Sequence, residues 1–137
     1  AGLQDPGVSG VISYYGPVNL TQGWRQPPRP DPIGSRSVLE ALIGGTPDQM
    51  PERYQHASPI TYVSAQAPRT LLIYGSHDHI VQSRYGRQLH GALVSAGATS
   101  ELIEIPWADH AFDALPAGLS GQLALFHTER FLAEVFR

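Results

Sequence analysis

Residues 70–74 (TLLIY) constrain the fold of this chain more than any other segment. A short uncharged run dominated by large apolar side chains is typical of a strand that is buried on both faces in a parallel sheet. A helical stripe near residues 83–96, a second strand at residues 101–105 and a last helix at about residues 120–136 follow in turn. Strands that alternate with helices across short connections predict an α/β fold with a parallel sheet.

The first half of the chain gives a different pattern. Residues 8–15 (VSGVISYY) are rich in β-branched and aromatic side chains and predict one more strand. Residues 19–33 contain four of the twelve prolines and predict an ordered surface loop, because proline disfavours both helix and sheet. A capping-box match at residues 37–40 predicts a short helix that ends at Gly44-Gly45, and a single helical turn is expected around residues 51–56.

Composition excludes several classes of function. Hydrophobic residues make up 42% of the chain and charged residues 15%, which is enough apolar material for a core. The net charge is −3 and the basic residues are scattered, so we expect no nucleic-acid partner. No apolar run approaches 18 residues, so we expect no membrane span. The absence of cysteine rules out disulfides, thiolate metal sites and a cysteine nucleophile.

An acid and a histidine each follow a predicted strand. Asp78 comes shortly after residues 70–74, and His110 comes shortly after residues 101–105. Functional groups of parallel sheets lie beyond the carboxyl ends of the strands, so these two side chains are expected at one site. An aspartate that orients an imidazole, and an imidazole that moves a proton, are two members of a nucleophile–histidine–acid relay. Asp109 and Asp113 are alternative candidates for the acid. The simpler interpretations are that Asp78 is a solvated turn residue and that His110 is a packed or surface imidazole.

The nucleophile of such a relay has no candidate in this chain. No G-x-S-x-G occurs in the 137 residues. The nearest string, Gly7-Val8-Ser9-Gly10, is one residue short and lies before a strand, whereas a nucleophile elbow follows one. We therefore predict that this chain supplies no nucleophile.

Two further sets of residues are candidates for a metal site and for the wall of a binding pocket. His77, Asp78 and His79, joined by His110 and Asp113, could form a hydrolytic zinc or manganese site. The strand end and the helix after it need no metal, so we predict neither a metal nor another cofactor. Binding pockets for small molecules are mostly apolar, and the candidates for a pocket wall are Tyr15, Trp24, Val81 and Phe112.

Four stretches carry a family resemblance. Residues 14–20 (YYGPVNL) resemble a Y-G-P-x-D-L turn with Asn19 in place of Asp, and residues 57–60 (ASPI) resemble the entry to an acid-bearing strand. Residues 68–81 (PRTLLIYGSHDHIV) resemble the block that contains the acid, and residues 107–112 (WADHAF) resemble the histidine loop, usually H-G-F, with Ala111 in place of Gly. Together they resemble the C-terminal half of an α/β-hydrolase, in the lipase/esterase group related to hormone-sensitive lipase and to bacterial feruloyl-type and acetyl esterases.

The resemblance implies a fold and an activity. It implies the C-terminal portion of an α/β-hydrolase domain over residues 1–137, with about three parallel strands, flanking helices and a loop- or cap-like excursion at residues 19–60. It implies a serine carboxylic-ester hydrolase of small-molecule esters in which Asp78 is the acid and His110 the base. The family's oxyanion loop and nucleophile elbow lie upstream of the region that is matched.

Two consequences follow for partners and activity. We expect the N-terminal half of the domain on a separate or cleaved chain, or a homodimer across the exposed edge of residues 8–15, and no turnover by this chain alone. A non-catalytic binding module and a peptidase or dienelactone-type hydrolase are the alternatives.

Overall fold

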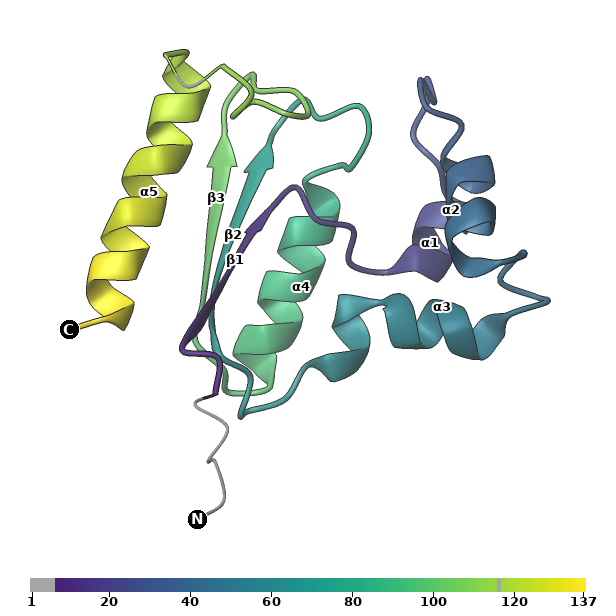
Figure 1. Cartoon of the computed structure of the whole chain (residues 1–137), viewed down its shortest axis with the longest axis horizontal. Coiled ribbons are helices and arrows are strands. Elements are labelled where there is room, and N and C mark those ends of the chain that lie inside the picture. The colour runs from purple at the N-terminus through teal and green to yellow at the C-terminus, as the bar shows by residue number, and fades with distance from the viewer. Residues whose placement is uncertain (1–6, 116) are drawn as a thin grey trace.

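Three parallel strands form the sheet at the centre of the molecule. The computed structural model describes residues 7–115 and 117–137. Within them, β1 (Gly10–Tyr14), β2 (Arg69–Gly75) and β3 (Ser100–Ile105) lie in the order β1-β2-β3, with β2 between the other two (Figure 1). The large apolar side chains of β2 are fully buried, which confirms the prediction of a strand covered on both faces.

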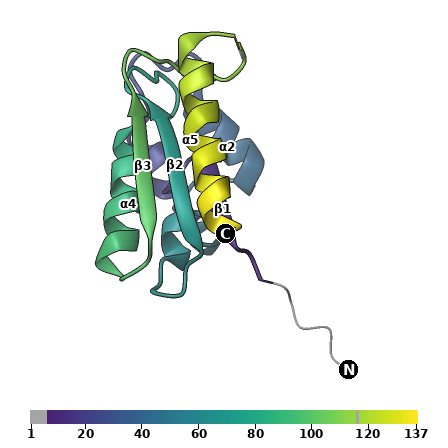
Figure 2. The same cartoon turned by 90° about the vertical axis from the view of Figure 1, so that its left-hand side faces the viewer.

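One long helix covers each face of the sheet. Figures 1 and 2 show α4 (Arg84–Ser95) on one face and α5 (Leu119–Val135) on the other. Because side chains alternate along a strand, Leu72 of β2 packs with the side chains of α4, whereas Leu71 packs with those of α5. The result is a three-layer α/β arrangement that confirms the predicted fold class.

The segment between β1 and β2 folds into short helices. These are α1 (Leu20–Arg25), α2 (Ser35–Ile43), α3 (Pro51–Ala57) and the 3-10 helix η1 (Pro59–Tyr62), and Figure 1 shows them to the side of α4. Leu20, Ile43 and Tyr54 form a small core of their own there. The excursion is therefore an ordered helical unit rather than an extended loop.

The helix α1 corrects the prediction of a loop over residues 19–33. Asn19 caps it, because its Oδ1 accepts the backbone N–H of Gln22 at 2.9 Å. All four prolines of this segment come after Gln26, where the helix has already ended. Proline density limited the length of the helix without preventing it.

The described part of the chain contains no helix that is both long and apolar enough to cross a bilayer.

Candidate active site

Asp78 lies in the turn that connects β2 to α4. It is 5% exposed, and its Oδ1 accepts the backbone N–H groups of Ile80 at 2.8 Å and Val81 at 2.7 Å. These two hydrogen bonds fix the plane of the carboxylate. The other oxygen, Oδ2, lies 2.9 Å from Nδ1 of His110.

His110 lies in the loop after β3 and is partly accessible. One quarter of its side chain is exposed, and its ring packs against the ring of Tyr15 with the centroids 4.3 Å apart. A carboxylate only accepts hydrogen bonds, so Nδ1 carries the proton in the contact with Asp78. No described residue hydrogen-bonds to Nε2. The tautomer with its proton on Nδ1 has a free lone pair at Nε2, which is what a general base needs.

Gly75 lets the two loops come together. The backbone N–H groups of Ser76 and His77 donate to the carbonyls of Ile105 and Ala108, each at 3.0 Å, so the turn after β2 is bonded directly to the loop after β3. A Cβ on Gly75 would overlap with the carbonyl oxygen of Ala108 and lie 2.8 Å from its carbonyl carbon. Only glycine fits where the two loops cross, and sequence reasoning passed over it.

Backbone strain gathers around His110. Among the described non-glycine residues, positive φ occurs at Tyr15 (41°), Trp107 (62°) and Ala111 (57°). Tyr15 packs on the imidazole, and the other two flank His110 in its own loop. Residues in sparsely populated backbone regions gather at functional sites, where the surrounding structure holds them in place. Ala111, which occupies the position where the resemblance expects Gly, therefore adopts the left-handed conformation that favours glycine.

Of the predicted wall residues, Tyr15 packs on the imidazole and Phe112 packs on Tyr15. The hydroxyl of Tyr15 donates to Oδ1 of Asp113 at 2.7 Å, and the ring of Phe112 packs edge-on against that of Tyr15 at 5.2 Å. The hydrogen bond to Asp113, followed by burial, raises the pKa of Tyr15 to about 12. Asp113 therefore anchors the tyrosine that supports His110 and does not face the imidazole itself.

Asp109, the other rival acid, pairs with a different histidine. Its Oδ2 lies 2.9 Å from Nδ1 of His79, and its Oδ1 accepts the backbone N–H groups of His79 and His110. The backbone N–H of His79 is the main cause that lowers the pKa of Asp109 to about 2. Of the three carboxylates considered, only Asp78 contacts the ring of His110.

The histidines that suggested a metal site point to separate partners. His77 stacks on the ring of Trp107 with the centroids 4.7 Å apart and the planes at 18°, while His79 pairs with Asp109. Across residues 7–115 and 117–137, no group of three or more His, Cys, Asp or Glu side chains could hold a metal ion. The geometry thus offers no ligand set for the metal-dependent alternative.

The structure separates the two remaining wall candidates. Val81 is at the site, since its N–H binds Asp78. Trp24 lies in α1, where its Nε1 donates to Oε1 of Glu40 at 2.7 Å and the guanidinium of Arg36 covers its ring, so these contacts tie it to the helical excursion. Trp107 was not among the predicted site residues, but it lies in the histidine loop and is 82% exposed.

Comparisons with known proteins point to one group. The model of the BD-FAE family matches residues 3–93. The chain is 30% identical over 133 residues to Esterase LipQ, and 33% identical over 134 residues to Probable carboxylic ester hydrolase LipM, both of Mycobacterium tuberculosis strain H37Rv. Each match covers 96% of this chain and 30% of the relative. The chain therefore spans about 30% of the length of these relatives.

Solved structures of esterases share the fold. One is a truncated form of a carbohydrate esterase from gut microbiota, with a TM-score of 0.66 and 24% identity over 89% of this chain and 42% of that one. Another is esterase 2 of Thermogutta terrifontis phosphonylated by sarin, with a TM-score of 0.71 and 22% identity over 93% of this chain and 44% of that one. These likenesses support the fold and no finer property.

Proposed function

The chain belongs to the BD-FAE family, an esterase-like hydrolase group of α/β-hydrolase type, and we propose that it supplies the acid and the base of a serine carboxylic-ester hydrolase. In this proposal Asp78 is the acid and His110 the base. The observation that carries it is the 2.9 Å contact between Oδ2 of the buried Asp78 and Nδ1 of the accessible His110.

Each of the two residues has a defined task in ester hydrolysis. Nε2 of His110 accepts the proton of the serine hydroxyl as that oxygen attacks the ester carbonyl, and then donates the proton to the leaving alcohol. A water molecule is activated in the same way to release the acid product. Asp78 holds the tautomer with its proton on Nδ1 and stabilises the imidazolium while it exists. The packing of Tyr15 against the ring supports the imidazole from one side.

The nucleophile and the oxyanion donors are proposed to come from polypeptide outside these residues. No G-x-S-x-G is present in the sequence, and oxyanion donors are usually the largest electrostatic contribution to acyl transfer. The chain alone is therefore expected to hydrolyse esters no faster than the uncatalysed background.

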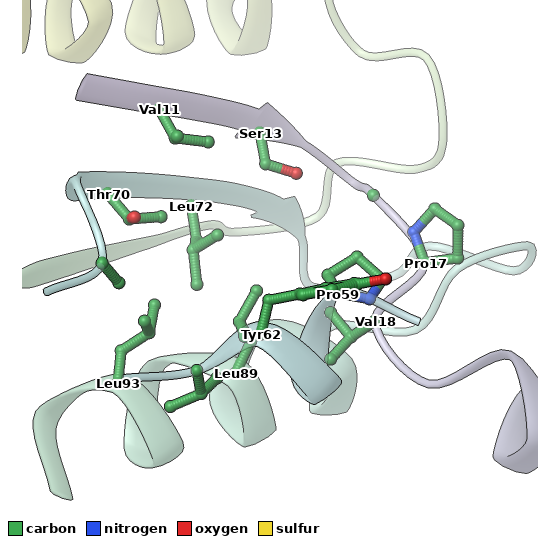
Figure 3. Close-up of a pocket in the computed structure, with 13 residues that line it drawn as sticks. Val11, Ser13, Pro17, Val18, Pro59, Tyr62, Thr70, Leu72, Leu89 and Leu93 are labelled. Atoms are coloured by element: carbon green, nitrogen blue, oxygen red, sulfur yellow. The ribbon is translucent and has the colours of Figure 1, made fainter. Parts of the chain in front are cut away.

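The free edge of β1 is the proposed place for the polypeptide that supplies the nucleophile. In the described part of the chain β1 pairs on one side only, with β2. Beside it lies a mostly apolar pocket of about 210 Å³ between β1, β2, η1 and α4, lined among others by Val11, Val18, Leu72 and Leu89 (Figure 3). A strand with a flanking helix from the N-terminal half would pair with the edge and fill this pocket.

Labelling with a fluorophosphonate probe, followed by denaturing intact mass spectrometry, tests the proposal. Probe and purified protein are mixed, and each polypeptide in the sample is weighed. One adduct on a polypeptide that contains a G-x-S-x-G, with the 14.9 kDa chain unlabelled, is the expected result. An adduct on the 14.9 kDa chain itself, or ester hydrolysis by that chain when pure, would overturn it.

A further inference from the structure

An apolar pocket lies between α2 and the segment that follows Asp78. Its volume is about 210 Å³. Ile33, Val38 and Leu42 line it from the side of the helical excursion, and Ile80 and Val81 line it from the other side. None of the described residues that line it is charged, so the pocket suits a neutral hydrocarbon group.

The helix α2 has more apolar surface than its own core uses. Ile43 is buried against Leu20 and Tyr54. On another side of the helix Val38 and Leu42, four residues apart and therefore neighbours, are 48% and 71% exposed and line the pocket. Large apolar side chains that gather in a concave, exposed place are typical of binding grooves.

The wall of this pocket is part of the proposed catalytic turn. The N–H groups of Ile80 and Val81 are the two donors that hold Oδ1 of Asp78, at 2.8 and 2.7 Å. We propose that the pocket binds the hydrocarbon part of the ester that is hydrolysed at Asp78 and His110. This inference rests on the proposed function for its biological meaning, but the binding itself does not depend on catalysis.

The volume sets the class of substrate. A dry apolar cavity of about 150 Å³ binds benzene, so about 210 Å³ accommodates a ring or chain of roughly six carbons. The preferred substrates are then esters with a medium-length alkyl or an aryl group, rather than acetates or long-chain lipids. Each methylene that enters the pocket is expected to improve affinity about fourfold, which corresponds to ~0.8 kcal/mol.

Titration of the isotope-labelled 137-residue chain with methyl ketones tests the pocket directly. 2-Butanone, 2-hexanone and 2-octanone carry the carbonyl and the alkyl chain of an ester but no bond to hydrolyse. The expected result is saturable NMR shifts at the methyl groups of Val38, Leu42 and Val81, with affinity that rises from 2-butanone to 2-hexanone and then levels off. Shifts confined to other parts of the protein, or the same affinity for all three ketones, would overturn the inference.

A matched pair of variants identifies the surface that binds. Leu42→Gln should weaken 2-hexanone binding about fivefold or more, since it removes an apolar wall of the pocket. Leu125→Gln is the control, because Leu125 is also an exposed helical leucine, 52% exposed on α5, and lies outside the pocket. Equal affinities in the two variants would contradict the proposed site.

The two proposals fail separately. Ketone binding at the pocket in a protein whose relay does not work would leave the pocket as a hydrocarbon-binding site and overturn the proposed function. A working relay with no ketone binding would leave the proposed function standing and overturn the proposed pocket.

Discussion

Asp113 is the clearest example of a single residue that acts through its neighbours. It lies three positions after His110, and its carboxylate receives the hydroxyl of Tyr15. That hydrogen bond is the largest cause of the raised pKa of Tyr15, because the carboxylate stabilises the protonated phenol.

Asp113→Asn is therefore expected to lower the pKa of Tyr15 from about 12 toward the ordinary value of 10.0, with burial keeping it above that value. The assigned ring resonances of Tyr15, followed by NMR from pH 8 to 13, measure the change. The hydroxyl of Tyr15 stays protonated to higher pH in the wild type than in Asp113→Asn. The titration curves of the two proteins therefore separate between the pKa of Tyr15 in the variant and its pKa in the wild type. Asp48→Asn, at an exposed aspartate on another part of the surface, should leave the titration unchanged. An unshifted midpoint in Asp113→Asn would show that burial alone sets this pKa.

Two aspartates near His110 allow the assignment of the acid to be tested. In the active assembly, Asp78→Asn is expected to lower kcat about 10⁴-fold, because an amide next to Nδ1 favours the wrong tautomer of the imidazole. Asp109→Asn is the matched control, since Asp109 binds the backbone of His110 rather than its ring. Its expected loss is less than about tenfold. Steady-state kinetics on a short acyl ester compare the two, and a larger loss in Asp109→Asn would transfer the acid role to Asp109.

At the level of secondary-structure elements, the crossing of the turn after β2 with the loop after β3 depends on Gly75. Gly75→Ala is expected to reduce the free energy of unfolding by about 1–3 kcal/mol, because its Cβ would meet the backbone of Ala108. Gly91→Ala is the control: Gly91 lies inside α4 with nothing near its missing Cβ, and alanine should stabilise the helix by about 0.5–1 kcal/mol. Urea unfolding measures both, and equal effects of the same sign would contradict the contact.

The elements that the sequence predicted well are those with one dominant hydrophobic pattern. The central strand was predictable because burial on both faces requires an uninterrupted apolar run in the sequence. The helix α4 was predictable because the face that it turns to the sheet requires an apolar stripe at helical spacing. Asp78 and His110 could be placed at one site because both follow neighbouring parallel strands.

The features that the sequence did not reveal depend on single side-chain contacts and on local backbone conformation. Trp24 looked like a pocket residue because its neighbours are polar, but its indole is held by Glu40, sixteen residues away. The helix α1 depends on a single capping side chain, Asn19, which the proline-rich segment after it obscured. Trp107 is exposed and has a positive φ, and a bulky residue in that conformation has no signature in the sequence.

For the whole molecule, the main consequence of the fold is that β1, whose outer edge has no partner among the described residues, lies next to an apolar pocket. An unpaired strand exposes a row of backbone N–H and C=O groups, which invites association with another chain. Val11 of β1 is 38% exposed and also lines the pocket beside that edge (Figure 3). Any partner that pairs with β1, whether the N-terminal half of the domain or a second copy of this chain, has to cover Val11.

Sedimentation velocity of the isolated chain tests this edge. The wild type is expected to sediment as a dimer or a larger species, and Val11→Lys as a monomer, because a charged side chain cannot be buried in the pairing surface without a partner. Val94→Lys is the control, since Val94 is 52% exposed on α4, outside that pocket. Circular dichroism checks that both variants remain folded. A wild-type chain that stays monomeric at every concentration would argue against a homodimer, and the polypeptide proposed to supply the nucleophile would then remain as the partner of the edge. If Val11→Lys and Val94→Lys dissociated the assembly equally, the contact would lie elsewhere than β1.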